Sequence, residues 1–372
     1  MRDRGNKLYR LLDRYAGIPL VLITGLGPNR STAIPASINR IALMKTGAIG
    51  DTILLDAVSK DIRKTWPQAK LTFFAGRDNY RVTDMLSEID EVIALPMNRP
   101  WIAVKRIFNS GRFDLWFDFS QWARIDALFT MVARASLKIG FRTTWQYRHY
   151  GYDIHVKHRD DVHEIHNFRD LVNIVGVRSQ TLPALRENSD SGNEIAISRL
   201  PVPYLIFHMF PGGSRAYMKE WPKENWVELA QYCLDKGWAV VLTGGPADFP
   251  RAQEFADNEK LQGREAVINL AGRSPLKLLP TLLAKSGLVI SVNTGVMHMA
   301  AAVGAQLIAI HGPTSPLRWG PLSPTATIIK PENMACSPCL NLGFEYKCDQ
   351  NYCLQSISPK VVISALEKLL TW

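Results

Sequence analysis

Four glycine-containing turns carry the residues whose types and spacing could do chemistry. In each turn a short apolar run ends, and polar or charged side chains follow before the next helical pattern begins. Glycine lets the backbone approach a ligand closely, and the free N–H groups at the start of a helix favour phosphate oxygens. The turns therefore predict a site for a phosphorylated ligand with carboxylates beside it.

The first turn is KTGAIGD, which runs from Lys45 to Asp51 and contains Gly47 and Gly50. No Lys-Ser/Thr pair follows its second glycine, so it is not a Walker loop. The GxGxxG spacing of a dinucleotide-binding fingerprint is absent as well. Asp51 could act as a general base or as a helix cap, and the two roles are compatible.

Three later turns predict a nucleotide site. Their sequences are FPGGSRAYMKEWP at 210–222, LTGGPAD at 242–248 and SVNTGVMHMAAAVG at 291–304. Glycine, serine and lysine can hold phosphate, an aspartate can accept hydrogen bonds from ribose, and a helix start favours pyrophosphate. Solvated loops, a helix-capping aspartate and a structural histidine are the alternatives. The candidate ligand-binding residues are Gly212, Gly213, Ser214, Lys219, Gly244, Gly245, Asp248, Asn293, Thr294, Gly295 and His298.

Strand and helix patterns alternate in two halves of the chain, which predicts two doubly wound α/β domains with parallel sheets. Ligands bind at the carboxyl ends of such strands, so the four turns are expected to face a cleft between the domains. Expected strands are 41–44, 71–75, 92–95, 114–119, 137–141, 204–210, 239–243, 267–270, 288–292 and 307–311. Expected helices are 52–66, 125–135, 162–175, 225–236, 250–260, 275–285, 295–303 and one from 358 onward.

The length of 372 residues suits two domains of similar size, and a polar stretch at 178–200 separates the two alternating halves. The expected organisation is a basic N-terminal arm at 1–39, an N-terminal domain at 40–185, a C-terminal domain at 200–357 and a C-terminal helix at 358–372.

The charge balance favours an anionic partner. The chain contains 44 Lys and Arg and 34 Asp and Glu, which gives a net charge of +10. A solvated basic surface is the simpler alternative. In the N-terminal arm, residues 1–14 combine five basic side chains with leucines, and the apolar run 18–26 is too short to span a bilayer. The arm is expected to lie on an anionic membrane surface or to pack on its own domain.

Five cysteines and the lack of a signal peptide indicate a reducing cytoplasm. Cys336, Cys339, Cys348 and Cys353 follow the spacing C-x2-C-x8-C-x4-C, which could ligate a structural zinc ion or could represent free thiols or a redox pair. Five of the eight histidines fall between residues 149 and 166. The segment HEIHN does not match the HExxH zinc motif, so a solvated or acceptor-facing patch is expected there.

Several segments, in this order, resemble glycosyltransferase family 9, the ADP-heptose:lipopolysaccharide heptosyltransferases and their relatives. KTGAIGDT resembles the Lys-x-x-x-x-Gly-Asp opening of the family, and HEIHNFRDLVNIVGV resembles the helix that ends its first domain. KEWPKENW resembles its Lys-x-Trp-Pro segment. VLTGGPAD, NTGVMHMAAAVG and HGPTSPLRWGP resemble its three downstream signatures. The resemblance extends from about residue 40 to the C-terminus, and some relatives carry cysteines in the same loop.

The resemblance implies a GT-B fold and an inverting sugar transfer without a catalytic metal. The N-terminal domain would bind the acceptor, and the C-terminal domain would bind a nucleoside-diphosphate sugar, with ADP-heptose suspected. Asp51 would deprotonate the acceptor hydroxyl, Lys219 with Thr294 and Gly295 would stabilise the departing diphosphate, and Asp248 would hold the ribose. The family usually has Asp where this chain has Asn293, and an amide brings no charge.

The expected protein is therefore a cytoplasmic enzyme, peripheral to the inner membrane, that acts on a lipopolysaccharide-core or related lipid-linked saccharide. Two other classes are disfavoured. A zinc-containing nucleic-acid-binding protein would need a basic stripe beyond the N-terminal arm, and a nucleotide-dependent oxidoreductase would need the missing GxGxxG. A relative that binds a glycan or nucleotide without transferring a sugar stays open because of Asn293.

Overall fold

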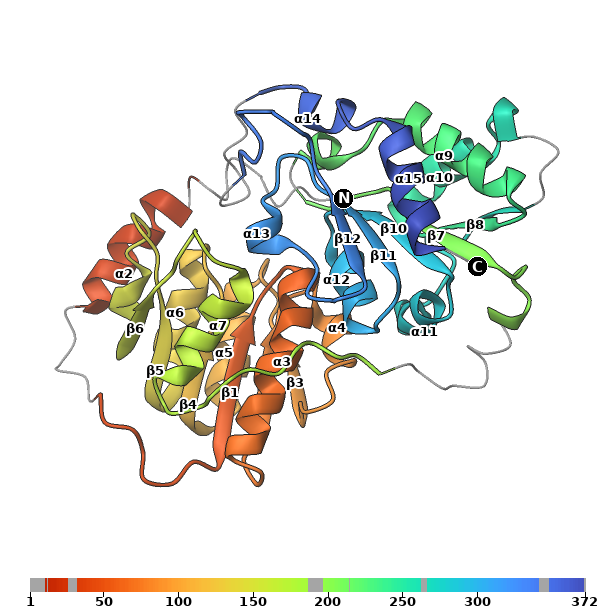
Figure 1. Ribbon diagram of the computed structural model, residues 1–372. Helices are drawn as coiled ribbons and strands as arrows, with labels where there is room; N and C mark the ends of the chain where they lie inside the picture. The colour runs from red at the N-terminus through yellow and green to blue at the C-terminus, as the bar shows by residue number, and fades with distance from the viewer. Residues whose placement is uncertain are drawn as a thin grey trace. The chain divides into compact units, whose positions relative to one another are not determined.

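The computed structural model describes residues 11, 13–25, 32–186, 197–213, 215–261, 266–340 and 348–370. The chain forms two compact units, of which the first extends to Pro183 and the second begins at Ala184. Each unit contains one six-stranded sheet in which all the strands are parallel. Figure 1 shows the helices that cover both sheets, and the prediction of two doubly wound α/β domains is confirmed.

The sheet of the N-terminal unit has the strand order β3-β2-β1-β4-β5-β6. Its strands are β1 (Arg40–Lys45), β2 (Lys70–Ala75), β3 (Glu91–Ala94), β4 (Arg112–Asp118), β5 (Arg134–Arg142) and β6 (Ile154–Lys157). Its helices are α2 (Gly17–Gly25), α3 (Ile49–Thr65), α4 (Tyr80–Thr83), α5 (Pro100–Asn109), α6 (Arg124–Val132), η1 (Arg148–Gly151) and α7 (Glu164–Asn173).

The helices of this unit divide between the two faces of its sheet. The connection β1–α3–β2 runs along the sheet in one direction and β3–α5–β4 runs in the other, so right-handed crossovers place α3 and α5 on opposite faces. The contacts agree, because α7 packs on α3, α6 packs on α5, and α2 packs on α6 and η1. The helix α2 therefore extends the layer formed by α5 and α6.

The sheet of the C-terminal unit has the strand order β12-β11-β10-β7-β8-β9. Its strands are β7 (Tyr204–His208), β8 (Ala239–Leu242), β9 (Val267–Asn269), β10 (Leu288–Val292), β11 (Leu307–Ile310) and β12 (Ala326–Ile329). Its helices are η2 (Ala216–Lys219), α9 (Lys223–Asp235), η3 (Pro246–Asp248), α10 (Phe249–Ala256), η4 (Glu259–Leu261), η5 (Leu276–Leu278), α11 (Leu279–Ala284), α12 (Gly295–Ala302), α13 (Pro316–Trp319), α14 (Tyr352–Gln355) and α15 (Pro359–Leu369).

Two edge strands, β6 and β12, were not expected from the sequence. Both contain four residues and keep part of their length accessible to solvent, so neither produces a long apolar run. The helix expected at 275–285 is divided into η5 and α11. The other expected strands and the long helices are present with small shifts at their ends. Short edge strands are stabilised by pairing with a neighbour that lies far away in the sequence, which local patterns do not report.

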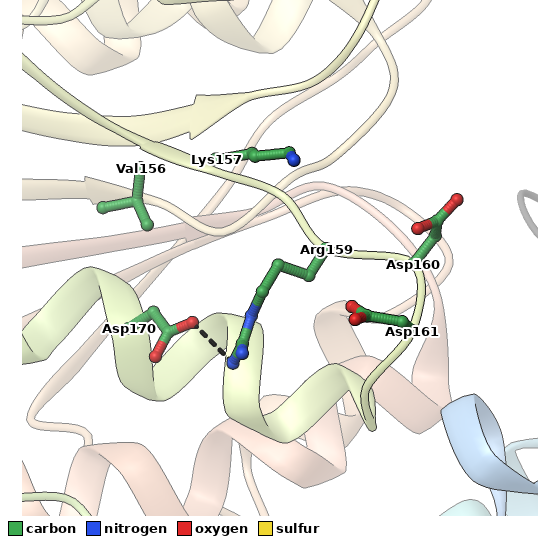
Figure 2. Close-up of a pocket in the computed structure, with 6 residues that line it drawn as sticks. All are labelled: Val156, Lys157, Arg159, Asp160, Asp161 and Asp170. Atoms are coloured by element: carbon green, nitrogen blue, oxygen red, sulfur yellow. Dashed lines mark ion pairs between the residues drawn. The ribbon is translucent and has the colours of Figure 1, made fainter.

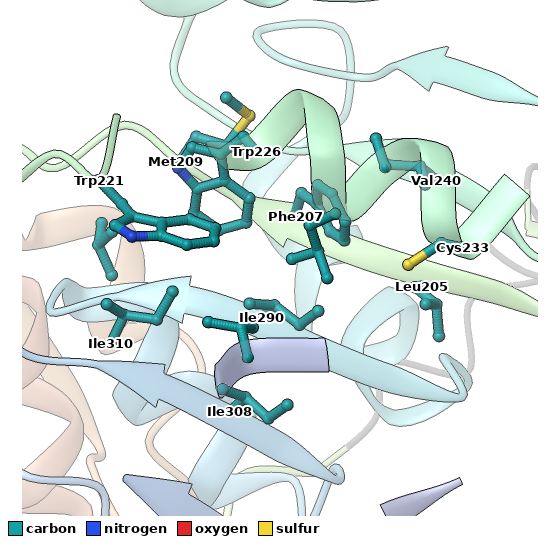
Figure 3. Close-up of a cluster of buried hydrophobic side chains, with 14 of the residues drawn as sticks. Leu205, Phe207, Met209, Trp221, Trp226, Cys233, Val240, Ile290, Ile308 and Ile310 are labelled. Atoms are coloured by element: carbon teal, nitrogen blue, oxygen red, sulfur yellow. The ribbon is translucent and has the colours of Figure 1, made fainter. Parts of the chain in front are cut away.

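The core of the C-terminal unit packs the KEWPKENW segment tightly onto its sheet (Figure 3). The rings of Trp221 and Trp226 lie 5.1 Å apart at 78°, and Trp226 also lies 5.0 Å from the ring of Phe207 in β7. The indole N–H of Trp221 donates to the carbonyl of Ile357 at 2.9 Å. The two tryptophans therefore hold the segment in a fixed position and leave its first residue, Lys219, partly exposed.

None of the helices in the described part of the chain combines the length and the apolar character needed to cross a membrane. The apolar run near the N-terminus forms α2, which contains nine residues.

Two buried histidines should make the C-terminal unit sensitive to acid. Burial lowers the pKa of His208 and of His311 to about 4, so both stay neutral in the folded unit. The unfolded chain binds protons below about pH 6.5, so stability is lost as the pH falls from that value toward 4. Between pH 7.5 and pH 5 we expect the free energy of unfolding to fall by about 2 kcal/mol for each histidine.

Urea unfolding at the two pH values would measure this loss. The variant His208→Asn keeps a polar partner for Thr243, whose hydroxyl lies 2.9 Å from the Nδ1 atom of the histidine. It should lose less stability on acidification than the wild type does. Equal pH dependence in the two proteins would contradict the prediction.

Candidate functional site

Lys45 and Asp51 meet at the carboxyl end of β1. Lys45 is the last residue of β1, and Asp51 lies in the first turn of α3. The helix begins after Ala48, which has φ = 64° and makes no side-chain capping bond. The connecting turn therefore contains Gly47, whereas Gly50 already lies inside α3. The side chain of Asp51 does not serve as the N-cap of this helix.

The Asp51 carboxylate is held through one of its two oxygens. Its Oδ2 atom lies 2.8 Å from the Lys45 ammonium and accepts a hydrogen bond of 3.2 Å from the Gln121 side-chain amide. Lys45 is almost fully buried, with 4% of its side chain exposed, whereas Asp51 keeps 14%. Both of these contacts use Oδ2.

A second layer of side chains fixes Gln121. Its amide nitrogen donates to Oε1 of Glu164 at 2.8 Å, and its amide oxygen accepts from Lys45. The same Glu164 oxygen lies 2.8 Å from Nε2 of His158, and Asn167 donates to Oε2 at 3.3 Å. Glu164 begins α7, so the turn after β4 and the start of α7 jointly position the Lys45–Asp51 pair.

The backbone of this turn is held by residues that follow β2. A Cβ atom on Gly76 would lie 1.9 Å from the carbonyl oxygen of Thr46, so only glycine allows this close approach. The Asn79 amide donates to the carbonyl of Lys45 and to the hydroxyl of Thr52, both at 2.8 Å. The sequence GRDN after β2 gives no motif that would have identified these supporting residues.

A buried polar network lies beneath the same turn. The Thr46 hydroxyl donates to Asp126 at 2.8 Å. Burial, with the neighbouring Asp118, raises the pKa of Asp126 to about 6. Asp118 pairs with the fully buried Arg148 at 2.7 Å and accepts from Tyr152 at 2.6 Å. Buried charges are stable only when paired in this way. The network therefore holds the polar side chains beneath the carboxyl edge of the sheet in a fixed arrangement.

The histidines between 149 and 166 do not form one solvated patch. His158 is buried against Glu164, and the Nδ1 atom of His163 caps α7 by accepting from the N–H of Ile165. The rings of His149 and His155 lie 5.2 Å apart. The expectation of a solvated patch is wrong for His158 and His163, because both pack at the start of α7, and the acceptor-facing alternative stays a prediction.

The three later turns lie side by side in the C-terminal unit. They follow β8, β7 and β10, which are neighbours in the sheet, and parallel pairing brings their carboxyl ends to one edge. After β7, the Lys219 ammonium donates to the carbonyl of Gly212 at 2.8 Å, and Gly213 has φ = 96°. Ser214 lies outside the described residues. A turn with a positive charge folded against it is suited to an anionic ligand.

Asp248 caps the turn that follows β8. Its Oδ2 atom accepts from the N–H of Gly245 at 2.8 Å, and burial raises its pKa. A Cβ atom on Gly244 would lie 2.9 Å from the Cβ of Asp248, so this glycine lets the turn close tightly. The structure therefore shows the capping alternative for Asp248, and a contact with ribose stays a prediction.

Asn293 and Thr294 connect β10 to α12. The Thr294 hydroxyl caps α12 by accepting from the N–H groups of Val296 and Met297, at 3.2 and 3.5 Å. The Asn293 side-chain amide donates to the carbonyl of Trp319 at 3.0 Å. A carboxylate cannot donate this bond, so the local structure favours Asn at a position where Asp was expected. His298 is buried one turn into α12.

The four cysteines of the predicted zinc site differ in exposure. Cys339 and Cys353 are buried, Cys348 is intermediate and Cys336 is exposed, and all are free thiols. Burial, together with the nearby Cys339 and Cys348, raises the pKa of the Cys353 thiol to about 11. Within the described residues no group of three or more His, Cys, Asp or Glu side chains is arranged to hold a metal ion. Residues 341–347 lie outside that description, and the zinc site stays a prediction.

A surface depression beside α7 contains none of the predicted site residues. Figure 2 shows charges of both signs around it, with Arg159 paired to Asp170 at 2.9 Å and Asp160 and Asp161 on the preceding loop. Its lining residues are Val156, Lys157, Arg159, Asp160, Asp161 and Asp170. An exposed depression with an internal ion pair presents no dominant charge to a ligand, and we assign it no role.

Comparisons with known proteins give one consistent result. Residues 101–348 match the model of glycosyltransferase family 9 (heptosyltransferase). The chain is 39% identical over 125 residues to lipooligosaccharide heptosyltransferase 2 of Haemophilus influenzae, which covers 34% of this chain and 36% of that protein. A lipopolysaccharide core heptosyltransferase of the same organism, OpsX, is 22% identical over 341 residues, which covers 88% of this chain and 96% of that protein. The first of these relatives is thus matched over about a third of its length.

Among solved structures, the ADP-heptose lipopolysaccharide heptosyltransferase II of Escherichia coli has the same fold. It superimposes with a TM-score of 0.71 at 23% identity, covering 89% of this chain and 98% of that chain.

The close contact between Gly76 and Thr46 predicts a position-specific effect of substitution. Gly76→Ala should lower the free energy of unfolding by about 2 kcal/mol or more, because its methyl group would overlap a backbone oxygen. At Gly287 a Cβ atom would meet its nearest neighbours at 3.6 Å, so the control Gly287→Ala should change stability by less than about 1 kcal/mol. Urea unfolding of both variants checks this, and similar losses would refute the steric explanation.

Proposed function

Because the chain belongs to glycosyltransferase family 9, the family of the heptosyltransferases, we propose that it transfers a heptose-like sugar from ADP-heptose to a lipid-linked saccharide of the lipopolysaccharide-core type. The observation that carries the proposal is the common edge of the C-terminal sheet at which three glycine turns, Lys219 and the start of α12 meet. The lipid of such an acceptor would put the reaction at the cytoplasmic face of the inner membrane.

The donor diphosphate would bind beside Lys219 and the start of α12. Gly212 and Gly213 offer backbone N–H groups, and the Lys219 ammonium is already folded against them at 2.8 Å from the Gly212 carbonyl. The amino-terminal end of α12 adds the partial positive charge of its dipole. The Escherichia coli protein with the same fold is an ADP-heptose heptosyltransferase, which supports adenine as the base of the donor nucleotide. Asp248 would accept a ribose hydroxyl through the oxygen that does not cap its turn.

The transfer would be a single in-line displacement with inversion at the anomeric carbon. The acceptor oxygen forms a bond to that carbon while the bond to the β-phosphate oxygen breaks, and the electron pair leaves with ADP. Asp51 takes the proton of the acceptor hydroxyl through Oδ1. No catalytic metal is invoked in this scheme, because Lys219 and the α12 dipole would compensate the charge that develops on the leaving diphosphate.

Lys45 and Gln121 would keep Asp51 competent for this step. Both hold Oδ2, so the carboxylate cannot rotate away from the acceptor. Glu164 and His158 act through Gln121 and are positioning residues rather than catalytic ones.

Asn293 supports one alternative within the same family. A chain that binds a nucleotide sugar without transferring it would also explain a neutral amide where a carboxylate is usual. The bond from Asn293 to the Trp319 carbonyl gives this amide a structural role of its own, which weakens that alternative. Turnover of any nucleotide sugar would exclude it.

The proposed base can be tested by a nearly isosteric change. Asp51→Asn should lower kcat by roughly 100-fold to 10,000-fold, because the amide cannot accept the acceptor proton. Binding of ADP should stay unchanged, because the donor residues belong to the C-terminal unit. Release of ADP from ADP-heptose in the presence of a heptose-deficient lipopolysaccharide core measures the rate. The exposed Asp84 supplies the control Asp84→Asn, and full activity in Asp51→Asn would remove Asp51 from the mechanism.

The proposed donor site can be tested without an acceptor. ADP should raise the Tm of the wild type by mass action, and by more than UDP or GDP does. Lys219→Met should weaken ADP binding by roughly tenfold or more, because a charge-assisted contact to phosphate is lost. The matched control Lys223→Met removes a nearby lysine that pairs with Glu254 at 2.6 Å, and its ADP response should equal that of the wild type. No response of the wild type to any nucleotide would overturn the donor assignment.

A further inference from the structure

The helix α2 consists of apolar residues except for one threonine. Its sequence, GIPLVLITG, contains no charged residue. Val21 is fully buried, whereas Leu20 and Ile23 expose 48% and 63% of their surface. A helix that only completed the fold of its own unit would carry polar side chains on its outer face. Here the outer face is as apolar as the inner one.

Small residues hold the inner face of α2 against the rest of the N-terminal unit. A Cβ atom on Gly17 would lie 3.2 Å from Arg124, and one on Gly25 would lie 2.7 Å from Tyr150. The contacts of α2 with α6 and η1 are therefore close ones. Because the helix is packed tightly on this side, its outward residues have a defined orientation.

The guanidinium of Arg124 ties the start of this segment to the loop that contains Trp145. Arg124 is buried and pairs with Asp13 at 2.6 Å. It also donates to the backbone carbonyls of Gln146 and Trp145, at 2.9 and 3.2 Å. The indole of Trp145 is 79% exposed, and Tyr15, two residues after Asp13, is 70% exposed. One buried cation thus places two exposed aromatic side chains on the same part of the surface.

We propose that these residues form a membrane-docking surface that binds an anionic phospholipid bilayer. The surface consists of Leu11, Tyr15, Leu20, Ile23 and Trp145. All five side chains are 48% exposed or more. The helix α2, at nine residues, is too short to cross a bilayer and would lie in the plane of the interface. Tyrosine and tryptophan favour the headgroup region, where one end of the ring is apolar and the other is wet.

The charges beside the docking surface match an anionic bilayer better than a protein partner. Arg14 is exposed between Asp13, which Arg124 neutralises, and Tyr15. Residues 1–10, which are covalently joined to this segment, contain four basic residues and one acidic residue. Each basic residue near an anionic membrane contributes a fewfold increase in partitioning. An apolar surface beside a cationic segment is the combination that peripheral membrane helices use.

The biological role that we give to membrane docking rests on the proposed function. A lipid-linked acceptor is confined to the membrane surface, so docking through the N-terminal unit would bring Asp51 to the layer in which the acceptor is found. The binding itself can be measured without any sugar donor or acceptor.

Cosedimentation with sucrose-loaded vesicles tests the docking surface on the full chain. The wild type should bind vesicles of phosphatidylcholine and phosphatidylglycerol and should bind vesicles of phosphatidylcholine alone more weakly. The double variant Leu20→Asp/Ile23→Asp should lose roughly tenfold or more in partitioning, and Arg14→Gln should lose about fivefold on the anionic vesicles alone.

Ile174 provides the matched control, because it is 40% exposed at the end of α7, on the opposite face of the same sheet. Ile174→Asp should bind vesicles as the wild type does. Equal partitioning of the wild type and the double variant would overturn the proposal. So would light scattering that shows a wild-type dimer converted to a monomer by the double variant, because the surface would then bind a second copy of the chain.

A failure of membrane docking can be distinguished from a failure of the proposed function. The double variant should keep the ADP-induced rise in Tm and should transfer sugar to an acceptor in detergent, while losing transfer to an acceptor embedded in vesicles. An absent ADP response in every protein would refute the donor assignment and leave the vesicle result to decide the docking surface. Equal transfer by the wild type and the double variant to the embedded acceptor would count against docking.

Discussion

Both candidate sites depend on the parallel pairing of the strands. In a parallel sheet every strand ends at the same edge, so turns that are far apart in the sequence become neighbours. In the N-terminal unit this places Lys45 at the end of β1 close to Gln121 after β4, where both reach Asp51. In the C-terminal unit it aligns the turns after β8, β7 and β10. An antiparallel arrangement of the same strands would send half of these residues to the opposite edge.

The Asp51 cluster shows how a buried cation can position a partly exposed carboxylate. Removing the Lys45 ammonium from water is costly unless acceptors replace its hydration. The Asp51 carboxylate, the Gln121 amide oxygen and the Phe119 carbonyl supply those acceptors. The arrangement leaves the partly exposed Asp51 as the member of the pair that faces solvent, and the residues behind it determine its orientation. The electrostatic demand of one buried lysine therefore accounts for much of the polar structure at this edge.

The C-terminal unit satisfies most of its turn residues internally. Lys219 contacts the Gly212 carbonyl, Asp248 caps its own turn, Thr294 caps α12, and Asn293 donates to Trp319. These bonds order the turns before any ligand arrives, which lowers the entropy cost of binding. Within the part of the chain that the structure describes, the outer face of α2 stays exposed, and its apolar side chains would be stabilised by contact with another apolar surface.

The alternation of apolar runs with helical patterns was sufficient to predict two doubly wound domains, and the glycine turns gave a prediction of where ligands would bind. These features are local, because strand formation, helix starts and tight turns leave their signals in neighbouring residues. The supporting residues were not predictable in the same way. Gly76, Asn79, Gln121 and Glu164 reach the Lys45 turn only because β1, β2, β4 and α7 come together in space. Whether Asp51 would cap its helix depended on Gln121, 70 residues away, and the reason for Asn at 293 depended on Trp319, 26 residues away. Only the tertiary structure decides such contacts, because hydrogen bonds between distant segments depend on how the elements pack and not on local sequence preference.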